Sequence, residues 1–444
     1  GYLVLNAADA LSEPGVWKTL KRALLHRKLE IQSIEGLSQH VNSALKPEAI
    51  DVNVKVILIG NNEIYYALSE YERDFKKIFK IKADFDYEIE NTPEAVQQYT
   101  GLLHKLVVNE NLKHFDKTAI AGIVEYGARR AGSQKKLTTQ FSEIADVVRE
   151  ATYWSKKNGN QYVDYHDVRM AIDELRNRHG LYEEKMQQLI SDEVILIDVE
   201  GRRVGQINGL AVYGGDRFGF GKPSRITASI SAGNNGIINI EREAKLSGKT
   251  HDKGVMILTG YIREEFAQKH PLALAASISF EQSYSGVDGD SASAAEMYAL
   301  LSAIAGIPIK QQFAVTGSMN QKGDIQPIGG VNEKIEGFFD VCSERGLTGN
   351  QGVIIPQQNV TDLMLRPEIV DAVKEGNFHI YPISKVQEGV ELLTGVKAGG
   401  RTARGTYERN TVYWKVAQKL EELRKYSMPQ RHAKKTKPKG EKKS

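Results

Sequence analysis

The amino-acid sequence predicts a multidomain α/β protein in which an α/β segment, an all-helical segment and a second α/β domain follow one another. The length of 444 residues is enough for about three domains. Only six glycines fall in residues 61–190, whereas twenty of the 40 glycines lie between Gly201 and Gly337. Short branched apolar runs flank the glycine-poor segment, which itself has helical spacing. We place the boundaries at residues 1–86, 87–190, 191–398 and 399–444.

The first segment, residues 1–86, combines strands with helices. The branched apolar runs Leu3–Leu5 and Val54–Ile59 each end in polar residues, which is typical of buried parallel strands. Between them, residues 14–29 carry apolar side chains at helical spacing. Because a domain rarely begins inside a core strand, we expect this sequence to be part of a longer protein.

The second segment, residues 87–190, is predicted to be an all-α bundle because helix-start signals recur in it. Thr92 followed by a proline favours one helix start, and Asp116 can cap a second helix. A third helix is expected from Leu137, and Asp164 opens a fourth that runs toward Gly180.

The third segment, residues 191–398, is predicted to be an α/β domain with many tight turns. Its strands are expected at residues 194–199, 226–230, 236–240, 255–258, 272–280, 313–315 and 352–355. Its helices are expected at residues 292–305, 331–345 and 385–393. The last segment, residues 399–444, carries an amphipathic helix at 411–426 and a lysine-rich end.

Composition and charge limit the cellular compartments and the binding partners that we expect for this protein. No apolar run approaches the roughly 20 residues that cross a bilayer, and no secretory signal is visible, so no membrane partner is expected. The single cysteine, Cys342, cannot form an internal disulfide, which favours a reducing compartment such as the cytoplasm. Residues 425–444 hold eight Lys/Arg and one Glu, a balance of +7, and the remainder carries 51 − 55 = −4. This basic tail either binds nucleic acid weakly or is a solvated end.

A candidate nucleophile, Ser291, lies where an apolar strand meets an alanine-rich helix. It would occupy or adjoin the first turn of that helix, with Asp288 and Asp290 as candidate caps. Helix N-termini present unpaired N–H groups and a partial positive charge, which can stabilise an oxyanion. Taken alone, the segment fits an ordinary helix cap better than a catalytic site.

A lysine is a better candidate for the base of this serine than a histidine. The domain holds three histidines in no recognisable triad motif: His251, His270 and His379. Lys334 would share one face of its helix with three apolar residues: Val331, Phe338 and Val341. Burial on that face would lower the pKa of the amine toward neutrality and make it a competent base. On its own, the pattern also fits a lysine at the edge of the apolar face whose amine reaches solvent or pairs with an acidic side chain.

Together these residues resemble the Ser–Lys dyad of Lon proteases. The run Asp-Gly-Asp-Ser-Ala-Ser at Asp288–Ser293 is followed, 43 positions after Ser291, by the lysine of Gly-Gly-Val-Asn-Glu-Lys. Between them, residues 313–317 and 323–330 resemble the Thr-Gly turn and the hairpin of that family. The resemblance spans residues 191–398. It implies an α/β Lon-type peptidase domain with Ser291 as nucleophile and Lys334 as general base.

The same resemblance implies roles for three further residues. Thr316 would orient the lysine, and Asp288 would be the acid that precedes the serine. Glu281 matches the LonB-type branch, and serines stand at the two positions where the LonA branch has histidines: Ser277 and Ser279.

The segments upstream of residue 191 resemble the other domains of Lon proteases. Residues 1–60 are similar to the second half of an AAA+ core, in which Asn61 would belong to sensor 1. Residues 125–132 resemble the sensor 2 region of the helical lid, which implies Arg129 and Arg130 as nucleotide-binding candidates. No G-x-x-x-x-G-K-S/T motif occurs, and the Walker B-like strand ends in Asn6 rather than in acidic residues. We therefore expect no ATP hydrolysis by this chain alone, with ATP and Mg²⁺ acting only in a longer protein.

The resemblance implies the C-terminal portion of a Lon-like serine endopeptidase. It would cleave unfolded or flexible polypeptides without a metal or cofactor, and it would assemble as a homohexamer. An ATP-independent chaperone or scaffold that retains a peptidase fold is the alternative. A third possibility is a nucleic-acid-tethered assembly that acts through the basic tail.

Overall fold

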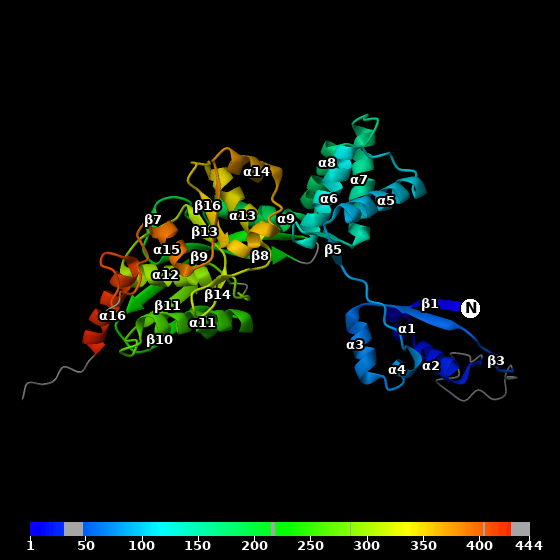
Figure 1. Cartoon of the computed structure of the whole chain (residues 1–444), viewed down its shortest axis with the longest axis horizontal. Helices are drawn as coiled ribbons and strands as arrows, with labels where there is room; N and C mark the ends of the chain where they lie inside the picture. Colours follow the sequence, from blue (N-terminus) through cyan, green and yellow to red (C-terminus); the bar gives the residue numbers. More distant parts are fainter. Residues whose placement is uncertain (31–47, 215–217, 285, 403–404, 428–444) are drawn as a thin grey trace, which may run out of the picture. The chain divides into compact units, whose positions relative to one another are not determined.

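The computed structural model describes residues 1–30, 48–214, 218–284, 286–402 and 405–427, which form two compact units (Figure 1). The first unit is Gly1–Asp86 and the second is Tyr87–Ser444. The mixed α/β, multidomain class predicted from the sequence is confirmed. Most of the basic tail, residues 428–444, lies outside the described residues.

The first unit contains a parallel pair of strands, as predicted. Its elements are β1 (Tyr2–Asn6), α1 (Ala7–Ser12), α2 (Val16–His26), β2 (Lys28–Leu29), β3 (Ile50–Asp51), β4 (Lys55–Ile59), α3 (Asn62–Tyr71) and α4 (Phe75–Ile78). β1 pairs with β4 in parallel, with Leu3 opposite Val56.

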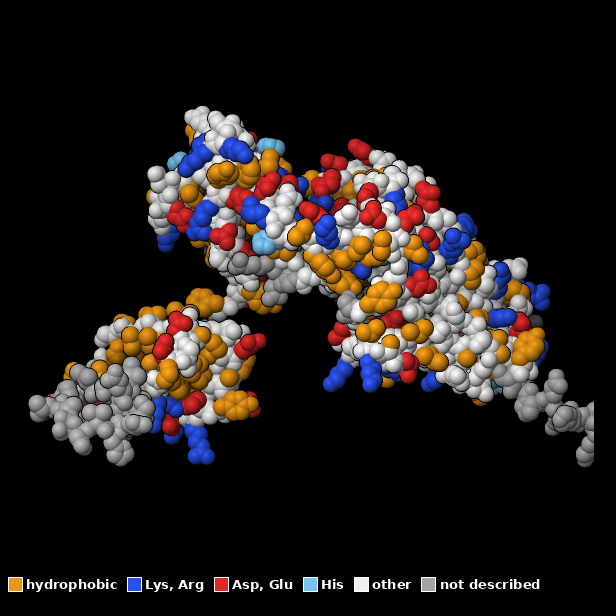
Figure 2. Space-filling view, turned by 180° about the vertical axis from the view of Figure 1, so that it is seen from behind, with side chains coloured by type: hydrophobic (Ala, Val, Ile, Leu, Met, Phe, Trp, Pro, Cys, Tyr) orange, Lys and Arg blue, Asp and Glu red, His pale blue; other side chains and the backbone are white. Residues whose placement is uncertain are grey.

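The prediction that these two strands are buried is wrong for the described chain. Tyr2 is 73% exposed and Ile59 is 59% exposed. Parallel sheets become buried when further strands and helices cover both faces, and here the described sheet has only two strands. Figure 2 shows apolar side chains spread over the surface of this unit.

The second unit begins with a helical bundle, and three of its predicted helix starts are confirmed. Its elements are β5 (Glu88–Glu90), α5 (Pro93–Asn109), α6 (Lys117–Ala131), β6 (Lys136–Thr138), α7 (Phe141–Lys157), α8 (Tyr165–His179) and α9 (Leu181–Ser191). Thr92, Asp116 and Asp164 cap α5, α6 and α8 through their side-chain oxygens.

The predicted start of the third helix at Leu137 is wrong. Leu137 lies in β6, which pairs antiparallel with β5, and α7 begins at Phe141. The side chain of Thr138 accepts a hydrogen bond from the Gln140 main chain, which turns the chain between the strand and the helix. The segment is therefore a helical bundle closed by a short strand pair.

The rest of the unit is built on a seven-stranded mixed sheet in the order β10-β11-β9-β8-β13-β16-β17 (Figure 1). These strands are β8 (Gln206–Gly214), β9 (Gly219–Ser231), β10 (Gly236–Asn239), β11 (Ala275–Phe280), β13 (Phe313–Val315), β16 (Gly352–Pro356) and β17 (His379–Ile383). The pairs β11–β9 and β9–β8 are antiparallel and the other four pairs are parallel.

Short pairs and helices complete the domain. The short strands are β7 (Arg202–Arg203), β12 (Ile309–Lys310), β14 (Ser318–Met319) and β15 (Ile325–Gln326). The helices are α10 (Ile240–Glu243), α11 (Lys249–Phe266), α12 (Ser293–Ala305), α13 (Val331–Arg345), η2 (Gln357–Asp362), α14 (Pro367–Lys374), α15 (Val386–Thr394) and α16 (Val412–Ser427).

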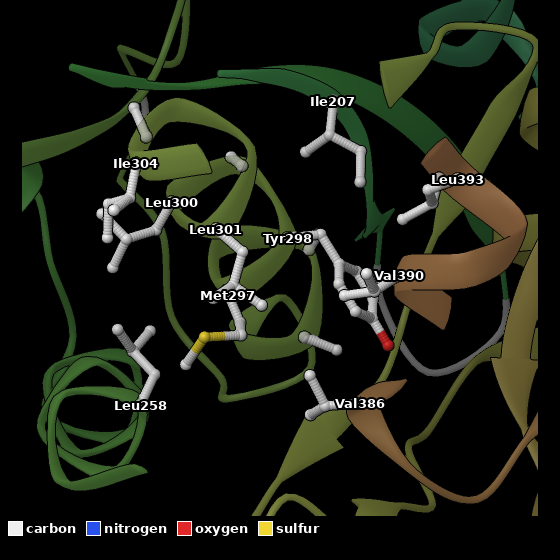
Figure 3. Packing of buried hydrophobic residues seen from close by; sticks show 14 of the residues in the cluster. Ile207, Leu258, Met297, Tyr298, Leu300, Leu301, Ile304, Val386, Val390 and Leu393 are labelled. Atoms are coloured by element: carbon white, nitrogen blue, oxygen red, sulfur yellow. The ribbon is translucent and has the colours of Figure 1, made fainter. Parts of the chain in front are cut away.

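Two hydrophobic cores lie on opposite faces of the sheet. Alternation along β16 sends Ile354 to one core and Val353 and Ile355 to the other. The first core is covered by α11, α12, α15 and α16, and the second by α9, α13 and α14. Figure 3 shows side chains of α12, Tyr298 among them, packed between α11 and α15. This arrangement places α12 and α13, the helices next to the candidate dyad, in different layers.

Two predicted strands are absent from the described fold. Residues 255–258 lie in α11, where Val255, Leu258 and Ile262 are buried at helical spacing, because a four-residue apolar run does not distinguish a strand from a helix. Residues 194–199 form no regular strand, and the N–H groups of Val194 and Ile195 bond back to the Leu189 carbonyl in α9. Gln282 also bonds the Leu196 N–H and the Val194 carbonyl at 2.8 and 2.7 Å.

Within the described ranges, the chain has no helix that is both long and apolar enough to cross a membrane.

Candidate active site

Ser291 lies in the turn just before α12. Its carbonyl accepts hydrogen bonds from the Gly317 N–H at 2.7 Å and from the Thr316 hydroxyl at 3.3 Å. Asp290 accepts from the Ser318 hydroxyl at 2.8 Å, and Ser293 accepts from the Met319 N–H at 3.1 Å. The turn is therefore fixed by the segment that follows β13.

The start of α12 leaves main-chain donors available beside the serine. The N-cap position is Ala292, which has no side-chain oxygen to cap the helix. Among the described residues, the N–H groups of Asp290, Ser291 and Ala292 donate no hydrogen bond. An anionic oxygen at this turn would meet unpaired donors and the positive end of a helix.

Lys334 reaches the serine from α13. Its Nζ donates to the Ser291 Oγ across 3.0 Å, and the residue is 3% exposed. Burial lowers the pKa of Lys334 to about 8, against the partly opposing effect of the negative charges of Glu333 and Asp290. The predicted burial of the lysine and the direction of its pKa shift agree with the structure.

The position of α13 depends on a close crossing with β9. A Cβ atom on Gly221 would lie 1.9 Å from the Glu333 carbonyl oxygen and 2.7 Å from the Lys334 Cα. A Cβ atom on Gly337 would lie 2.0 Å from the Gly221 carbonyl oxygen. Only glycine at both positions lets the strand and the helix approach this closely, and the sequence reasoning did not identify this pair.

Thr316 lies at the site, where its described side-chain hydrogen bond goes to the serine main chain. It is fully buried, and its hydroxyl donates to the Ser291 carbonyl. Its described hydrogen bonds therefore hold the turn that carries the nucleophile.

Asp288 caps a different helix from the one expected. Its Oδ1 accepts from the N–H groups of Gly289, Thr250 and His251 at 2.8, 3.2 and 3.3 Å. The bond from Gly289, together with those from His251 and Thr250, lowers the pKa of the Asp288 carboxyl. The expectation that Asp288 or Asp290 caps α12 is wrong, because Asp288 caps α11 and Asp290 accepts from Ser318.

Glu281 follows β11 and pairs with a strand arginine. Its Oε2 lies 3.8 Å from the Arg225 Nη1, and its side chain is 39% exposed. Arg225 in turn pairs with Asp198 at 3.3 Å. Within the part of the chain that the structure describes, Glu281 makes no bond to Ser291 or Lys334.

The three nucleotide-binding candidates each have a structural partner. Asn61 caps α3 by accepting from the Ile64 N–H at 2.9 Å. Arg130 pairs with Glu143 at 2.6 Å within the helical bundle. Arg129 forms a two-bond pair with Glu336 of α13, at 2.6 and 2.8 Å. Local sequence patterns did not indicate that last contact, whose partners are 207 residues apart.

A buried polar cluster beside α12 was also missed. His251 Nε2 lies 2.9 Å from Glu296 Oε1, and both side chains are 1% exposed. His251 Nδ1 lies 3.0 Å from the Ser247 hydroxyl. The histidine is thus engaged with Glu296 and Ser247 rather than with Ser291. Among the described residues, no group of three or more His, Cys, Asp or Glu side chains is placed to hold a metal ion.

Three family models match successive parts of the chain. Residues 1–86 match the LonB-like AAA domain, and residues 114–178 match the AAA+ ATPase lid domain of archaeal LonB. Residues 277–394 match the Lon protease C-terminal proteolytic domain, and this match includes both Ser291 and Lys334.

Related proteins carry the same family name. A Lon protease homolog of Escherichia coli is 33% identical over 439 residues, which cover 97% of this chain and 72% of the relative. A Lon protease homolog of Haemophilus influenzae is 33% identical over 89% of this chain and 65% of the relative. The archaeal Lon protease of Archaeoglobus fulgidus is 29% identical over 88% of this chain and 60% of the relative. The chain thus spans about two thirds of the length of these relatives, and it belongs to the Lon protease family.

Proposed function

We propose that this chain is a serine endopeptidase that cleaves polypeptides through a Ser291–Lys334 dyad. The observation that carries the proposal is the 3.0 Å hydrogen bond between a buried lysine amine and the hydroxyl of a serine at an uncapped helix start. A buried amine of lowered pKa beside a hydroxyl is the arrangement that a nucleophile and its base require. The alternative of a scaffold without activity gives no reason for this pairing.

We propose the following course for the reaction. With Lys334 neutral, the Ser291 O–H donates to the amine, and Oγ attacks the substrate carbonyl while Nζ accepts the proton. The unpaired N–H groups of Asp290, Ser291 and Ala292 would stabilise the resulting oxyanion. Lys334 returns the proton to the departing amine, which leaves an ester on Ser291. Water then gives a proton to the Lys334 amine and attacks the ester, and Lys334 passes this proton to the Ser291 oxygen as the new carboxyl end of the substrate departs.

The pH dependence of cleavage tests the base. Only neutral Lys334 accepts a proton, so the rate should rise with pH through the pKa of this amine, about 8, rather than through the ordinary lysine value of 10.5. Initial rates on a fluorogenic peptide between about pH 6 and pH 10 measure this midpoint. A rate that does not change across that range would contradict a lysine base.

The nucleophile is tested by replacing Ser291 with alanine. Ser291→Ala should lower casein and fluorogenic-peptide cleavage by at least about 1,000-fold, because the attacking atom is lost. Ser302→Ala is the matched control, since it removes a buried hydroxyl near the other end of α12 that bonds the Gly205 N–H and the Ile307 carbonyl. Comparable loss in both variants, with both proteins folded, would count against Ser291 as the nucleophile.

The substrate, assembly and nucleotide assignments extend the proposal by family likeness. We propose unfolded or flexible polypeptides as substrates and a homohexamer as the working assembly. Peptide hydrolysis by this dyad needs no metal or cofactor, and any role of ATP and Mg²⁺ would belong to a longer protein. A cytoplasmic location and weak nucleic-acid binding by the basic tail remain predictions.

A further inference from the structure

Helix α13 has two chemically different faces. Lys334 lies on the face that packs into the domain. On the nearly opposite face, Glu333, Glu336 and Asp340 follow one another at helical spacing. A surface helix would expose such a row of carboxylates, yet the Glu336 side chain is only 6% exposed. The acidic face of α13 is therefore occupied by other parts of the chain.

Arg129, from α6 of the helical bundle, forms a salt bridge with Glu336 on this acidic face. Its Nη1 donates to Glu336 Oε1 at 2.6 Å and its Nη2 donates to Oε2 at 2.8 Å, which is the strong two-bond geometry of an Arg–carboxylate pair. Nη1 also donates to the Met364 carbonyl at 2.9 Å, and Nη2 lies 3.8 Å from Glu333.

Two further arginines complete the contact. Arg366, which precedes α14, donates its main-chain N–H to Glu336 Oε1 at 3.1 Å and pairs with Asp340. Arg176 of α8 lies 3.6 Å from Asp340. Arg129, with Arg366 and Arg176, holds the pKa of the Glu336 carboxyl low although burial alone would raise it. A charged, buried Glu336 therefore depends on these partners, and Arg129 is the one that makes the two-bond contact.

Other hydrogen bonds also join the helical bundle to the rest of the unit. Gln134 bonds the Leu363 carbonyl through its side chain at 2.8 Å and the Thr361 carbonyl through its main chain at 3.0 Å. These bonds join the bundle to the η2 region rather than to α13. The Arg129–Glu336 pair differs because Glu336 stands two residues after Lys334 on the same rigid helix.

We propose that Arg129 is a positioning residue for the peptidase reaction. Its salt bridge with Glu336 holds α13 in place, so that the Lys334 amine stays within hydrogen-bond distance of the Ser291 hydroxyl. This proposal rests on the proposed function of the dyad. It also means that the helical bundle, although it contributes nothing to the dyad itself, sets the geometry of the base.

Loss of the Arg129–Glu336 salt bridge would change the surroundings of the Lys334 amine. The charged groups around Lys334 are Asp290 on the nucleophile turn and Glu333 on α13. On β9, Gly221 faces the helix and the next residue, Lys222, is 8% exposed. If α13 tilts away from Ser291, the amine gains water, and the Glu333 carboxylate on the same helix moves with it. The pKa of Lys334 would then rise toward the ordinary lysine value.

The test uses the full chain and compares Arg129→Ala, Arg129→Lys and Glu336→Gln with Arg149→Ala. Arg149 is the matched control because it forms a two-bond pair with Glu110, at 2.8 and 2.7 Å, that stays within the helical bundle. Two readouts are measured together. The first is the pKa of Lys334, from the pH dependence of its acetylation followed by mass spectrometry. The second is kcat and KM on a fluorogenic peptide, with thermal unfolding as a check on folding.

Arg129→Ala should raise the acetylation midpoint by about one pH unit and lower kcat about ten-fold at neutral pH, with KM within about two-fold. Arg129→Lys should fall between Arg129→Ala and the unmodified protein, since it keeps the charge and loses the fork. Arg149→Ala should match the unmodified protein. Glu336→Gln, which preserves size, replaces Arg129→Ala if the latter does not fold.

The proposal is overturned if the folded Arg129 and Glu336 variants keep the acetylation midpoint and kcat of Arg149→Ala. It is likewise overturned if activity falls only in proportion to the unfolded fraction. Failure of the dyad would look different, because cleavage would then be absent in the unmodified protein or would persist in Ser291→Ala. The acetylation midpoint would still report the effect of Arg129 on Lys334 in that case.

Discussion

Replacement of Lys334 by alanine should reduce peptide cleavage by about 100- to 10,000-fold, the range expected when a general base is lost. Lys334→Arg should be equally inactive, because a guanidinium group stays protonated and cannot accept the serine proton. The arginine variant is the sharper of the two, since it retains a positive charge at the site. It therefore separates a base from a residue that merely contributes charge.

Two comparisons complete this test. The double variant Ser291→Ala/Lys334→Ala should be no worse than either single variant, because the members of one catalytic unit are not additive. Lys222→Met is a matched control, since Lys222 is also a buried lysine whose pKa burial lowers, and it lies over the Tyr213 ring rather than at a serine. Near-full activity in Lys334→Arg would exclude a lysine base, and inactivity in Lys222→Met would show that the assay responds to any buried lysine.

Helices and their ends were predictable where the residues that determine them lie within the helix or next to it in the sequence. The helix expected at residues 331–345 has those bounds in the structure, because two glycines precede it, a glycine follows it and its buried positions recur at helical spacing. The caps at Thr92, Asp116 and Asp164 were predictable for the same reason. The run at 255–258 was not, since four apolar residues fit either period and only the neighbours at 261 and 262 reveal the helix.

In the candidate site, too, features set by nearby residues were predictable and contacts with distant elements were not. The burial of Lys334 could be read from its own helix, whereas its proximity to Ser291 came from a family resemblance. The partners of Asp288 and Arg129 could not be predicted, because each binds an element that lies far away along the chain. Asp288 faces the start of α11, 38 positions from Thr250. A side chain typical of a cap or a sensor does not reveal which distant helix it will meet.

Gly221→Ala and Gly337→Ala should each lower kcat/KM about 100-fold while leaving most of the protein folded. Neither glycine has a positive φ angle, so the cost comes from space rather than from backbone strain. The atoms that a new methyl group would meet are main-chain atoms at 1.9 and 2.0 Å, which cannot rotate away. Strand β9 and helix α13 must therefore separate, and overpacking of this kind costs about 1–3 kcal/mol of stability.

The loss of activity should exceed the loss of stability because the helix that moves carries Lys334. A displacement of about 1 Å in a reacting group can cost about 100-fold in rate, and the hydrogen bond at risk is the 3.0 Å contact with Ser291. Gly101→Ala is the control, since a methyl group there, on α5, meets no atom within 4 Å. Cleavage rates and thermal unfolding of the three variants measure both effects. Unchanged rates in Gly221→Ala and Gly337→Ala would mean that the crossing yields without moving the base, and that the close approach of β9 to α13 serves packing alone.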